Sequence, residues 1–217
     1  EQTQKTGKVF KLPLAIDVYS GNDKQRYKVW VENKIDTFNF SYSKHPDLVN
    51  VDADKVMLWA KTDNKTADNY VFQYAHAPLY LDRKEALDYF AKKNMKELAN
   101  GLKDKYAPLR RSTLEKLADS KLAGDPAILD AAQFIGETEK DRKTKAAALS
   151  LLAKTGDAKY ASLFKKNLDD SSYSVAGAAL KGLNALEPAN AYAMAKKYSS
   201  DAKGDLGEVV GNVVMSN

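Results

Sequence analysis

Four copies of a short apolar motif constrain the fold of this chain most. In each copy, two apolar residues stand three positions apart, and a small or β-branched residue precedes the first. Successive copies are 35, 31 and 30 residues apart: Thr113-Leu114/Leu117, Ala148-Leu149/Leu152, Ala179-Leu180/Leu183 and Val209-Val210/Val213. Such a period is typical of stacked helical hairpins, because one hairpin cannot bury its apolar face by itself. We therefore expect residues 80–217 to form an α-solenoid of HEAT- or ARM-like helical hairpins.

Shorter helical patterns lie between these copies. We expect second helices over residues 159–168 and 189–198, with breaks at Gly156-Asp157 and Glu187-Pro188. The last apolar segment, residues 205–215, is typical of the first helix of a further hairpin whose partner lies outside the sequence. Since the chain also starts without a methionine, we expect a truncated array and an excerpt of a longer protein.

The first part of the chain has a different period. Apolar residues alternate with polar ones over 10–18, 27–31 and 37–42, and two shorter apolar runs follow at 48–51 and 56–60. Alternation of this kind predicts strands with one buried face. We expect five or so short strands in an antiparallel β-sandwich over residues 1–79, so that the chain is an α+β protein of two domains. A module of this size is marginal alone, and Trp30 and Trp59 are candidates for a contact with a neighbour or for ordinary core residues.

Charge and composition exclude several classes of function. The chain has 34 basic and 29 acidic residues, which alternate along the sequence, so a solvated surface is a better interpretation than a nucleic-acid-binding face. A nucleic-acid-binding solenoid would need its Lys and Arg gathered on one face. The absence of cysteine excludes disulfides and thiolate metal sites. No apolar run approaches the ~20 residues that span a bilayer.

No constellation of catalytic, cofactor-binding or metal-ligating residues stands out, and we assign none. His45 and His76, the two histidines, lie in different sequence contexts and show no metal-binding spacing. Asp52 and Asp54 are interpreted as a polar turn rather than a cation site. The Asp169-Asp170-Ser171-Ser172 run is interpreted as the cap of a helix, where carboxylates favour the positive end of the helix dipole.

Several local segments of the first part have a recognisable pattern: Glu1–Gln4, Val9-Phe10-Lys11-Leu12-Pro13-Leu14, Phe38-Asn39-Phe40 and Val49-Asn50-Val51-Asp52 with Val56-Met57-Leu58. They resemble segments in the C-terminal half of aminopeptidase N-like zinc metallopeptidases. In the second part, Asp170-Ser171-Ser172-Tyr173-Ser174-Val175 followed by Ala179-Leu180 and Leu183 is similar to a helix of that family's HEAT-type domain. The Leu-Pro-Leu segment ahead of helical repeats is the more specific feature.

The resemblance implies a non-catalytic piece of a zinc aminopeptidase: the small sandwich, and part of the helical cover that restricts peptide access to the active site. Zinc, its ligands and the catalytic glutamate would belong to an upstream catalytic domain of the same polypeptide, which is then the expected partner. Peptides would be the substrates of the parent enzyme, and its location would be extracytoplasmic. The alternative is a free-standing HEAT-like scaffold for protein–protein interaction, which would present a concave surface to its partners.

Overall fold

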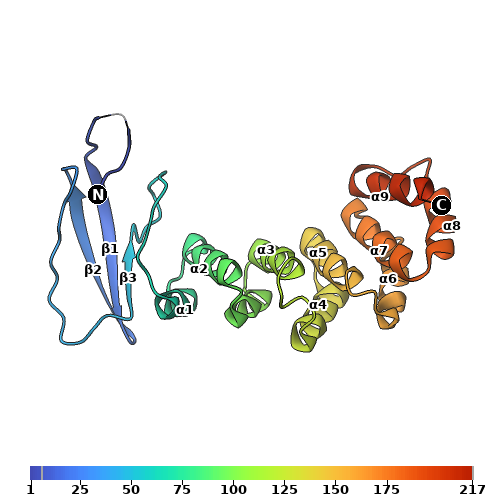
Figure 1. The fold of residues 1–217 in the computed structure, drawn as a ribbon, viewed down its shortest axis with the longest axis horizontal. Helices are drawn as coiled ribbons and strands as arrows, with labels where there is room; N and C mark the ends of the chain where they lie inside the picture. Colours follow the sequence, from blue (N-terminus) through green and yellow to red (C-terminus); the bar gives the residue numbers. More distant parts are fainter. Residues whose placement is uncertain (6, 217) are drawn as a thin grey trace. The chain divides into compact units, whose positions relative to one another are not determined.

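The computed structural model describes residues 1–5 and 7–216 and shows a mixed α/β protein (Figure 1). The chain divides into two compact units, Glu1–Tyr89 and Phe90–Asn217. The division falls within helix α2 (Tyr80–Lys93), later than the boundary expected at residue 79. Each unit is described by itself below.

The first unit contains one antiparallel sheet of three strands in the order β2-β1-β3: β1 (Leu12–Ser20), β2 (Asp23–Val31) and β3 (Leu48–Val51). The β1–β2 hairpin closes at the pair Ser20–Asp23, and its turn uses Gly21 at a φ of 60°. A left-handed residue suits a two-residue hairpin turn, which is why glycine stands there. Pro13 lies before the part of β1 that pairs with β3, so its missing N–H breaks no hydrogen bond to that strand.

The expected strands over 37–42 and 56–60 do not form, and a single three-stranded sheet is not a sandwich. In the first segment, Phe40 stacks on Tyr27 of β2 with ring centroids 4.1 Å apart, so side chains rather than a backbone ladder hold it there. The second segment follows a sharp turn in which Asp52 and Lys55 have φ values of 55° and 53°. The pairing with β1 ends at Val51, ahead of this turn.

Two helices complete the first unit. Helix α1 (Ala67–His76) was not expected from the sequence, although Thr66 and Asn69 form a capping box at its start. The next helix, α2, starts at Tyr80, and Asp82 lies in its first turn. Helix α1 packs on β3, and Tyr19 of β1 meets Phe72 of α1 edge to face at 5.9 Å.

All the regular secondary structure described in the second unit is helical. Its elements are η1 (Lys96–Lys103), α3 (Ala107–Ala118), α4 (Pro126–Thr138), α5 (Arg142–Ala153), η2 (Ala158–Tyr160), α6 (Ala161–Asn167), α7 (Tyr173–Leu186), α8 (Pro188–Tyr198) and α9 (Gly204–Met215). Helices α3, α5, α7 and α9 pack one on the next and form a row. The shorter helices lie against this row: α4 on α5, α6 on α7, and α8 on both α7 and α9 (Figure 1).

The four sequence motifs fall on these four row helices. Their second apolar residues, Leu117, Leu152, Leu183 and Val213, are all buried. Small residues allow the close packing that results. Gly182 of α7 faces Phe164 of α6, and a Cβ at this glycine would lie 2.6 Å from the aromatic ring. The apolar period of the sequence therefore corresponds to the helix row.

The last apolar segment of the sequence forms helix α9, which packs on both α7 and α8. Each short helix packs on the long helix that follows it, since α4 contacts α5 and α6 contacts α7. In the sequence, the apolar motif indicates where the long helices are. It does not show which short helix each long helix contacts.

Candidate binding groove

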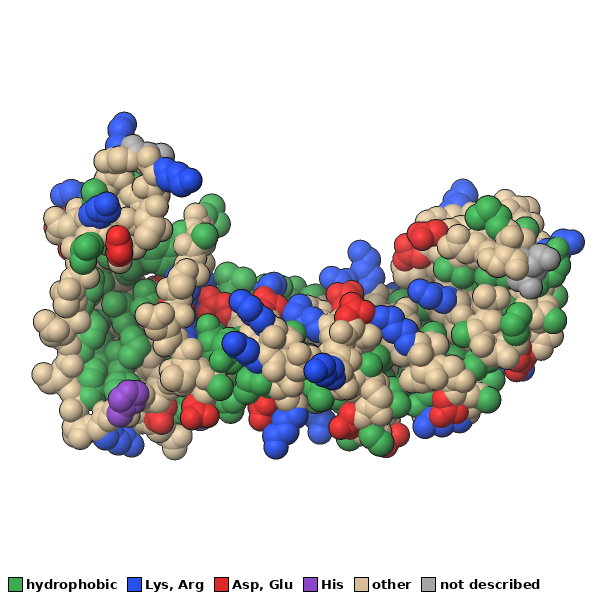
Figure 2. Space-filling model, in the orientation of Figure 1, with side chains coloured by type: hydrophobic (Ala, Val, Ile, Leu, Met, Phe, Trp, Pro, Cys, Tyr) green, Lys and Arg blue, Asp and Glu red, His purple; other side chains and the backbone are tan. Residues whose placement is uncertain are grey.

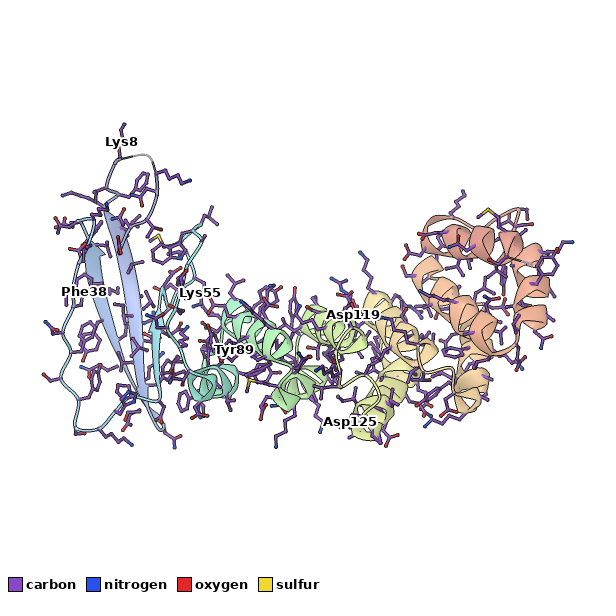
Figure 3. All side chains as sticks on the ribbon, viewed as in Figure 1. Lys8, Phe38, Lys55, Tyr89, Asp119 and Asp125 are labelled. Atoms are coloured by element: carbon purple, nitrogen blue, oxygen red, sulfur yellow. The ribbon has the colours of Figure 1, made fainter. Side chains whose placement is uncertain are left out.

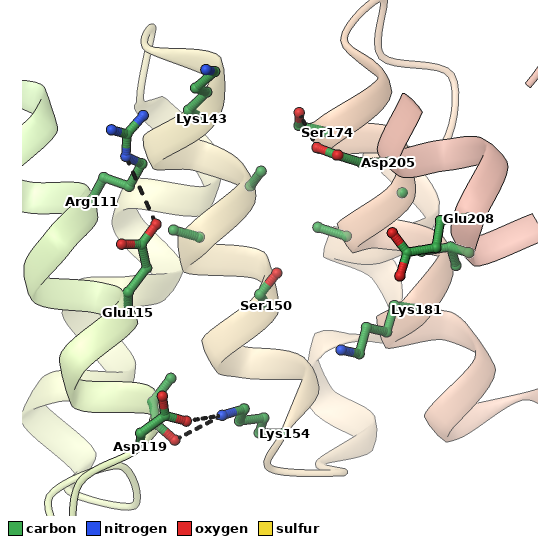
Figure 4. A pocket seen from close by; sticks show the side chains of 16 residues that line it. Arg111, Glu115, Asp119, Lys143, Ser150, Lys154, Ser174, Lys181, Asp205 and Glu208 are labelled. Carbon is green, nitrogen blue, oxygen red and sulfur yellow. Dashed lines mark hydrogen bonds and ion pairs between the residues drawn. The ribbon is translucent and has the colours of Figure 1, made fainter. Parts of the chain in front are cut away.

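A polar groove of about 680 Å³ runs over the face that α3, α5, α7 and α9 present together (Figure 4). Its floor consists of small residues from the two middle helices: Ala146, Ala147 and Ser150 of α5, and Gly177 and Ala178 of α7. Longer charged side chains rise around this floor. The groove thus combines a shallow floor with charged walls and belongs entirely to the second unit.

Helical spacing explains why these residues share one face. Arg111, Glu115 and Asp119 follow one another at intervals of four on α3, and Lys143, Ala147, Ser150 and Lys154 at intervals of four, three and four on α5. Residues three or four apart lie on the same side of a helix. The last wall forms because α9 approaches α7 closely: a Cβ at Gly177 would lie 3.1 Å from the Asp205 carbonyl oxygen. Ser174 also donates a hydrogen bond to Asp205 across this contact.

The charges of the groove are arranged in rows. The middle helices contribute Lys143, Lys154 and Lys181, whereas α3 and α9 contribute acidic residues on either side: Glu115 and Asp119, and Asp205 and Glu208. Lys154 Nζ lies 2.6 Å from Asp119 Oδ1, and Arg111 Nε lies 3.8 Å from Glu115 Oε1. Within the described part of the chain, Lys143, Lys181 and Glu208 have no ion-pair partner. These three side chains are therefore available to charged groups of a ligand.

Basic and acidic side chains also intermingle on the face of the second unit that Figure 2 shows. The sequence analysis required Lys and Arg to be gathered on one face for a nucleic-acid-binding solenoid. No such concentration is seen on this face, and the groove itself has four basic and four acidic side chains. The walls of the groove therefore carry charges of both signs.

The two histidines lie beside a common hollow, which the sequence analysis did not anticipate. His45 and His76 line one hollow of about 510 Å³ in the first unit, together with Asp47 and Asp68. His76 stacks on Phe72 with ring centroids 4.0 Å apart. Asp68 and His76 stand at opposite ends of α1, about 12 Å apart along the helix axis at the usual rise per residue. Among residues 1–5 and 7–216, no three His, Asp or Glu side chains are grouped as metal ligands.

The other polar clusters noted in the sequence are parts of turns. Asp52 accepts hydrogen bonds from the N–H groups of Val56 and Met57, at 3.2 Å each, and Asp54 pairs with Arg26. The prediction of a polar turn at Asp52 and Asp54 is confirmed. Asp170 accepts the N–H of Ser172 ahead of α7, whereas Asp169 accepts the hydroxyl of Tyr198 at 2.7 Å.

A buried cluster of three lysines and three carboxylates was missed entirely. Lys55, Lys61 and Lys65 extend from the loop after β3 and meet Asp63 of the same loop and Asp82 and Glu85 of α2. Figure 3 labels Lys55 on this loop. Burial raises the pKa of Asp63, but the ion pairs of this carboxylate with Lys61 and Lys65 outweigh burial and lower its pKa overall. Burial also lowers the pKa of Lys65, even though Asp63 lies 2.8 Å away. The cluster holds an irregular loop in place.

The chain matches no protein-family model and no curated protein. None of the helices in the part that the structure describes has the length and apolar character to cross a membrane.

Proposed function

We propose that this chain is a non-catalytic part of an aminopeptidase N-like zinc metallopeptidase, in which the helix row covers the active site and restricts the peptides that reach it. One observation carries the proposal. The Phe10-Lys11-Leu12-Pro13-Leu14 segment leads into β1 of an antiparallel sheet, and the same chain continues into a row of packed helices with a polar groove. This order of elements is what the resemblance implies.

The finer architecture belongs to the same proposal. In it, the three-stranded sheet is one part of a small β-sandwich, and the segments 37–42 and 56–60 are strands that pair once the sandwich is complete. The helix row is a HEAT-like solenoid, in which α3, α5, α7 and α9 form the inner layer. The regular packing of these helices and their small residues at close contacts support this interpretation.

The groove supplies the contact with peptides. A peptide carries backbone dipoles, two charged termini and mixed side chains, and Lys143, Lys181 and Glu208 offer both signs of charge to them. These residues would bind distal parts of a substrate and take no part in bond cleavage. Zinc and the groups that activate water would lie in the upstream catalytic domain. An extracytoplasmic location fits the resemblance.

Two measurements test this function. The purified chain is expected to hydrolyse no aminoacyl anilide and to bind no stoichiometric zinc. The gene that contains it is expected to encode His-Glu-x-x-His upstream, with a further glutamate after that motif. Zinc or hydrolysis found in the isolated chain, or a complete gene without this motif, would refute the proposal.

A protein-binding scaffold is the second candidate. The extent of the groove over four helices favours it, because stacked helical repeats present such surfaces to partner proteins. The gene distinguishes the two candidates. If the metallopeptidase motif is absent, the scaffold is the better interpretation and the groove is its binding surface.

A further inference from the structure

A second hollow of the helical unit, of about 620 Å³, is lined by the end of η1, the start of α3 and one face of α4. Four residues of α4 line it at helical spacing: Ala131, Phe134, Ile135 and Thr138. Leu102 and Ile135 are buried and close its floor, whereas Phe134 is 65% exposed. The apolar surface that remains open to a ligand therefore centres on the Phe134 ring.

The one carboxylate among the described lining residues is already neutralised. Glu139 Oε2 accepts hydrogen bonds from Arg110 Nε at 2.9 Å and from Arg110 Nη2 at 2.6 Å. Its other oxygen accepts the N–H groups of Lys140 and Asp141 at 2.9 and 3.0 Å. Burial raises the pKa of Glu139, but the N–H of Asp141 and the Arg110 guanidinium outweigh burial and lower this pKa overall. Glu139 thus stays ionised, and Arg110 offsets its charge.

Two lysines of the hollow have no such partner. Lys103 ends η1 and Lys140 follows α4 by two residues, and both side chains are exposed. Neither forms an ion pair or a side-chain hydrogen bond with any described residue. Cations near the C-terminal ends of helices are favourable by themselves, so this position alone does not require a ligand. With Arg110 and Glu139 included, the lining has three basic side chains and one acidic side chain, and it therefore favours an anion.

The surroundings of the hollow favour a small ligand over a protein. Between residues 107 and 172, Phe134 is the only large apolar side chain that is exposed. A standard protein interface buries about 800 Å² on each partner and depends on a central cluster of anchoring residues. Asp130 and Glu137 also neighbour Phe134 on α4, but they do not line the hollow. The volume of the hollow lies within the range of small-molecule sites, which combine apolar walls with a few charged groups.

We propose that this hollow binds a small aromatic carboxylate, whose ring lies on Phe134 and whose carboxylate is held by Lys103 and Lys140. Aromatic rings associate in offset-stacked or edge-to-face arrangements, for which an exposed phenyl ring is suited. A lysine ammonium has three donors on a flexible stem, so two of them can bind one carboxylate from the rim of a hollow. The site goes beyond the proposed function and does not depend on it, since none of the described residues lines both this hollow and the groove.

The test uses the full chain, labelled with ¹⁵N, and 2-naphthoate as the probe. Chemical-shift changes are expected at residues 102–103, 131–135 and 138–140. The expected Kd is on the order of 1 mM, as for a small ligand in an open site. The neutral 2-naphthamide has nearly the same shape and is expected to bind at least about fivefold more weakly. About 0.5 M NaCl should weaken the binding of 2-naphthoate and leave that of 2-naphthamide unchanged.

Protein variants separate the role of charge from that of the ring. The double variant Lys103→Gln/Lys140→Gln removes both unpaired ammonium groups and is expected to bind 2-naphthoate about as weakly as 2-naphthamide. Phe134→Ala is expected to weaken both probes at least about fivefold. Lys121→Gln/Lys166→Gln, at two exposed lysines outside the hollow and the groove, is the matched control and should leave both affinities unchanged. All five positions are exposed, so each variant is expected to keep the fold.

Several results would overturn the inference. They are the absence of shifts at these residues with several-millimolar 2-naphthoate, equal binding of 2-naphthoate and 2-naphthamide at low salt, and unchanged binding in the double variant of the two hollow lysines. Binding of the capped peptide Asp-Leu-Phe-Asp without binding of 2-naphthoate would also overturn it, and would assign the hollow to a protein partner.

Discussion

Lys55 Nζ lies 2.9 Å from Asp82 Oδ1, and the two side chains are only 7% and 1% exposed. This buried pair joins the irregular loop after β3 to the first turn of α2. Asn50 completes it, since its amide donates to Asp82 at 2.9 Å and accepts from Lys55 at 2.9 Å. Desolvated charges of this kind are tolerated because each has a charged and a polar partner.

Removal of one member of this pair should destabilise the first unit strongly. Lys55→Met leaves the Asp82 carboxylate buried without its cation, and the expected loss is about 3–5 kcal/mol in the free energy of unfolding. Urea denaturation followed by circular dichroism measures it. Lys84→Met is the matched control, because Lys84 and Asp88 form an exposed pair that should contribute less than about 1 kcal/mol. Similar losses for the two variants would contradict the role assigned to burial.

Glycine at position 182 should be required for the packing of α6 on α7. In Gly182→Ala, the new Cβ would lie 2.6 Å from the Phe164 ring, and Phe164 is itself buried, so the helices must separate. The expected destabilisation is about 1–3 kcal/mol, as for other overpacked cores.

Gly211→Ala tests the same substitution where space is open. Apart from the nearby backbone of its own helix, no atom of the described residues lies within 4 Å of a Cβ at Gly211, and the residue is inside α9. Alanine favours a helix over glycine, so a gain of up to about 1 kcal/mol is expected. Thermal denaturation of both variants should show opposite shifts in Tm. A neutral Gly182→Ala would mean that α6 and α7 do not pack as closely as described.

Acid should destabilise the first unit through Asp17. Burial raises the pKa of Asp17, but its hydrogen bond and charge interaction with Arg26 outweigh burial and hold this pKa below the usual value of 3.8. A carboxylate with a depressed folded-state pKa contributes stability that is complete above its unfolded pKa and is lost as the pH falls through the folded one. The free energy of unfolding should therefore fall from about pH 4 downward.

Asp17→Asn should reduce both the stability at neutral pH and its slope in acid. Asp119→Asn is the control, because that side chain is 79% exposed in its pair with Lys154. Urea titrations between pH 2 and 7 measure the slope. An unchanged slope in Asp17→Asn would show that other carboxylates, such as Asp63, determine the acid response.

Patterns that repeat along the chain could be read from the sequence. The apolar motif predicts the long helices because its residues recur at helical spacing on a buried face, as Leu149 and Leu152 do. The β1–β2 hairpin was predictable for the same reason, since alternate residues of β1 face one side and Gly21-Asn22 mark its turn. Such features depend on neighbours in the sequence.

Features that depend on distant residues were missed. In the sequence, nothing distinguishes Lys55, Lys61 and Lys65 from lysines exposed to solvent. Only the fold brings Asp82 and Glu85 to them. The pattern at 56–60 predicted a strand, but its position after the left-handed turn at Asp52 and Lys55 keeps it from pairing with the sheet. The groove was also missed, because Lys143 and Lys181 come from different helices and their shared face depends on the packing of α5 on α7.

The free lysines of the groove should affect ligand binding without affecting stability. Lys181→Glu replaces an exposed side chain with no ion-pair partner in the described chain, so the free energy of unfolding should change by less than about 0.5 kcal/mol. In the proposed parent enzyme, the same change should alter kcat/KM for peptides of several residues and leave that for single aminoacyl anilides unchanged, because a short substrate does not reach the groove. Lys166→Glu, on α6 outside the groove, is the control. Equal effects of Lys181→Glu on long and short substrates would exclude the groove as a distal peptide site.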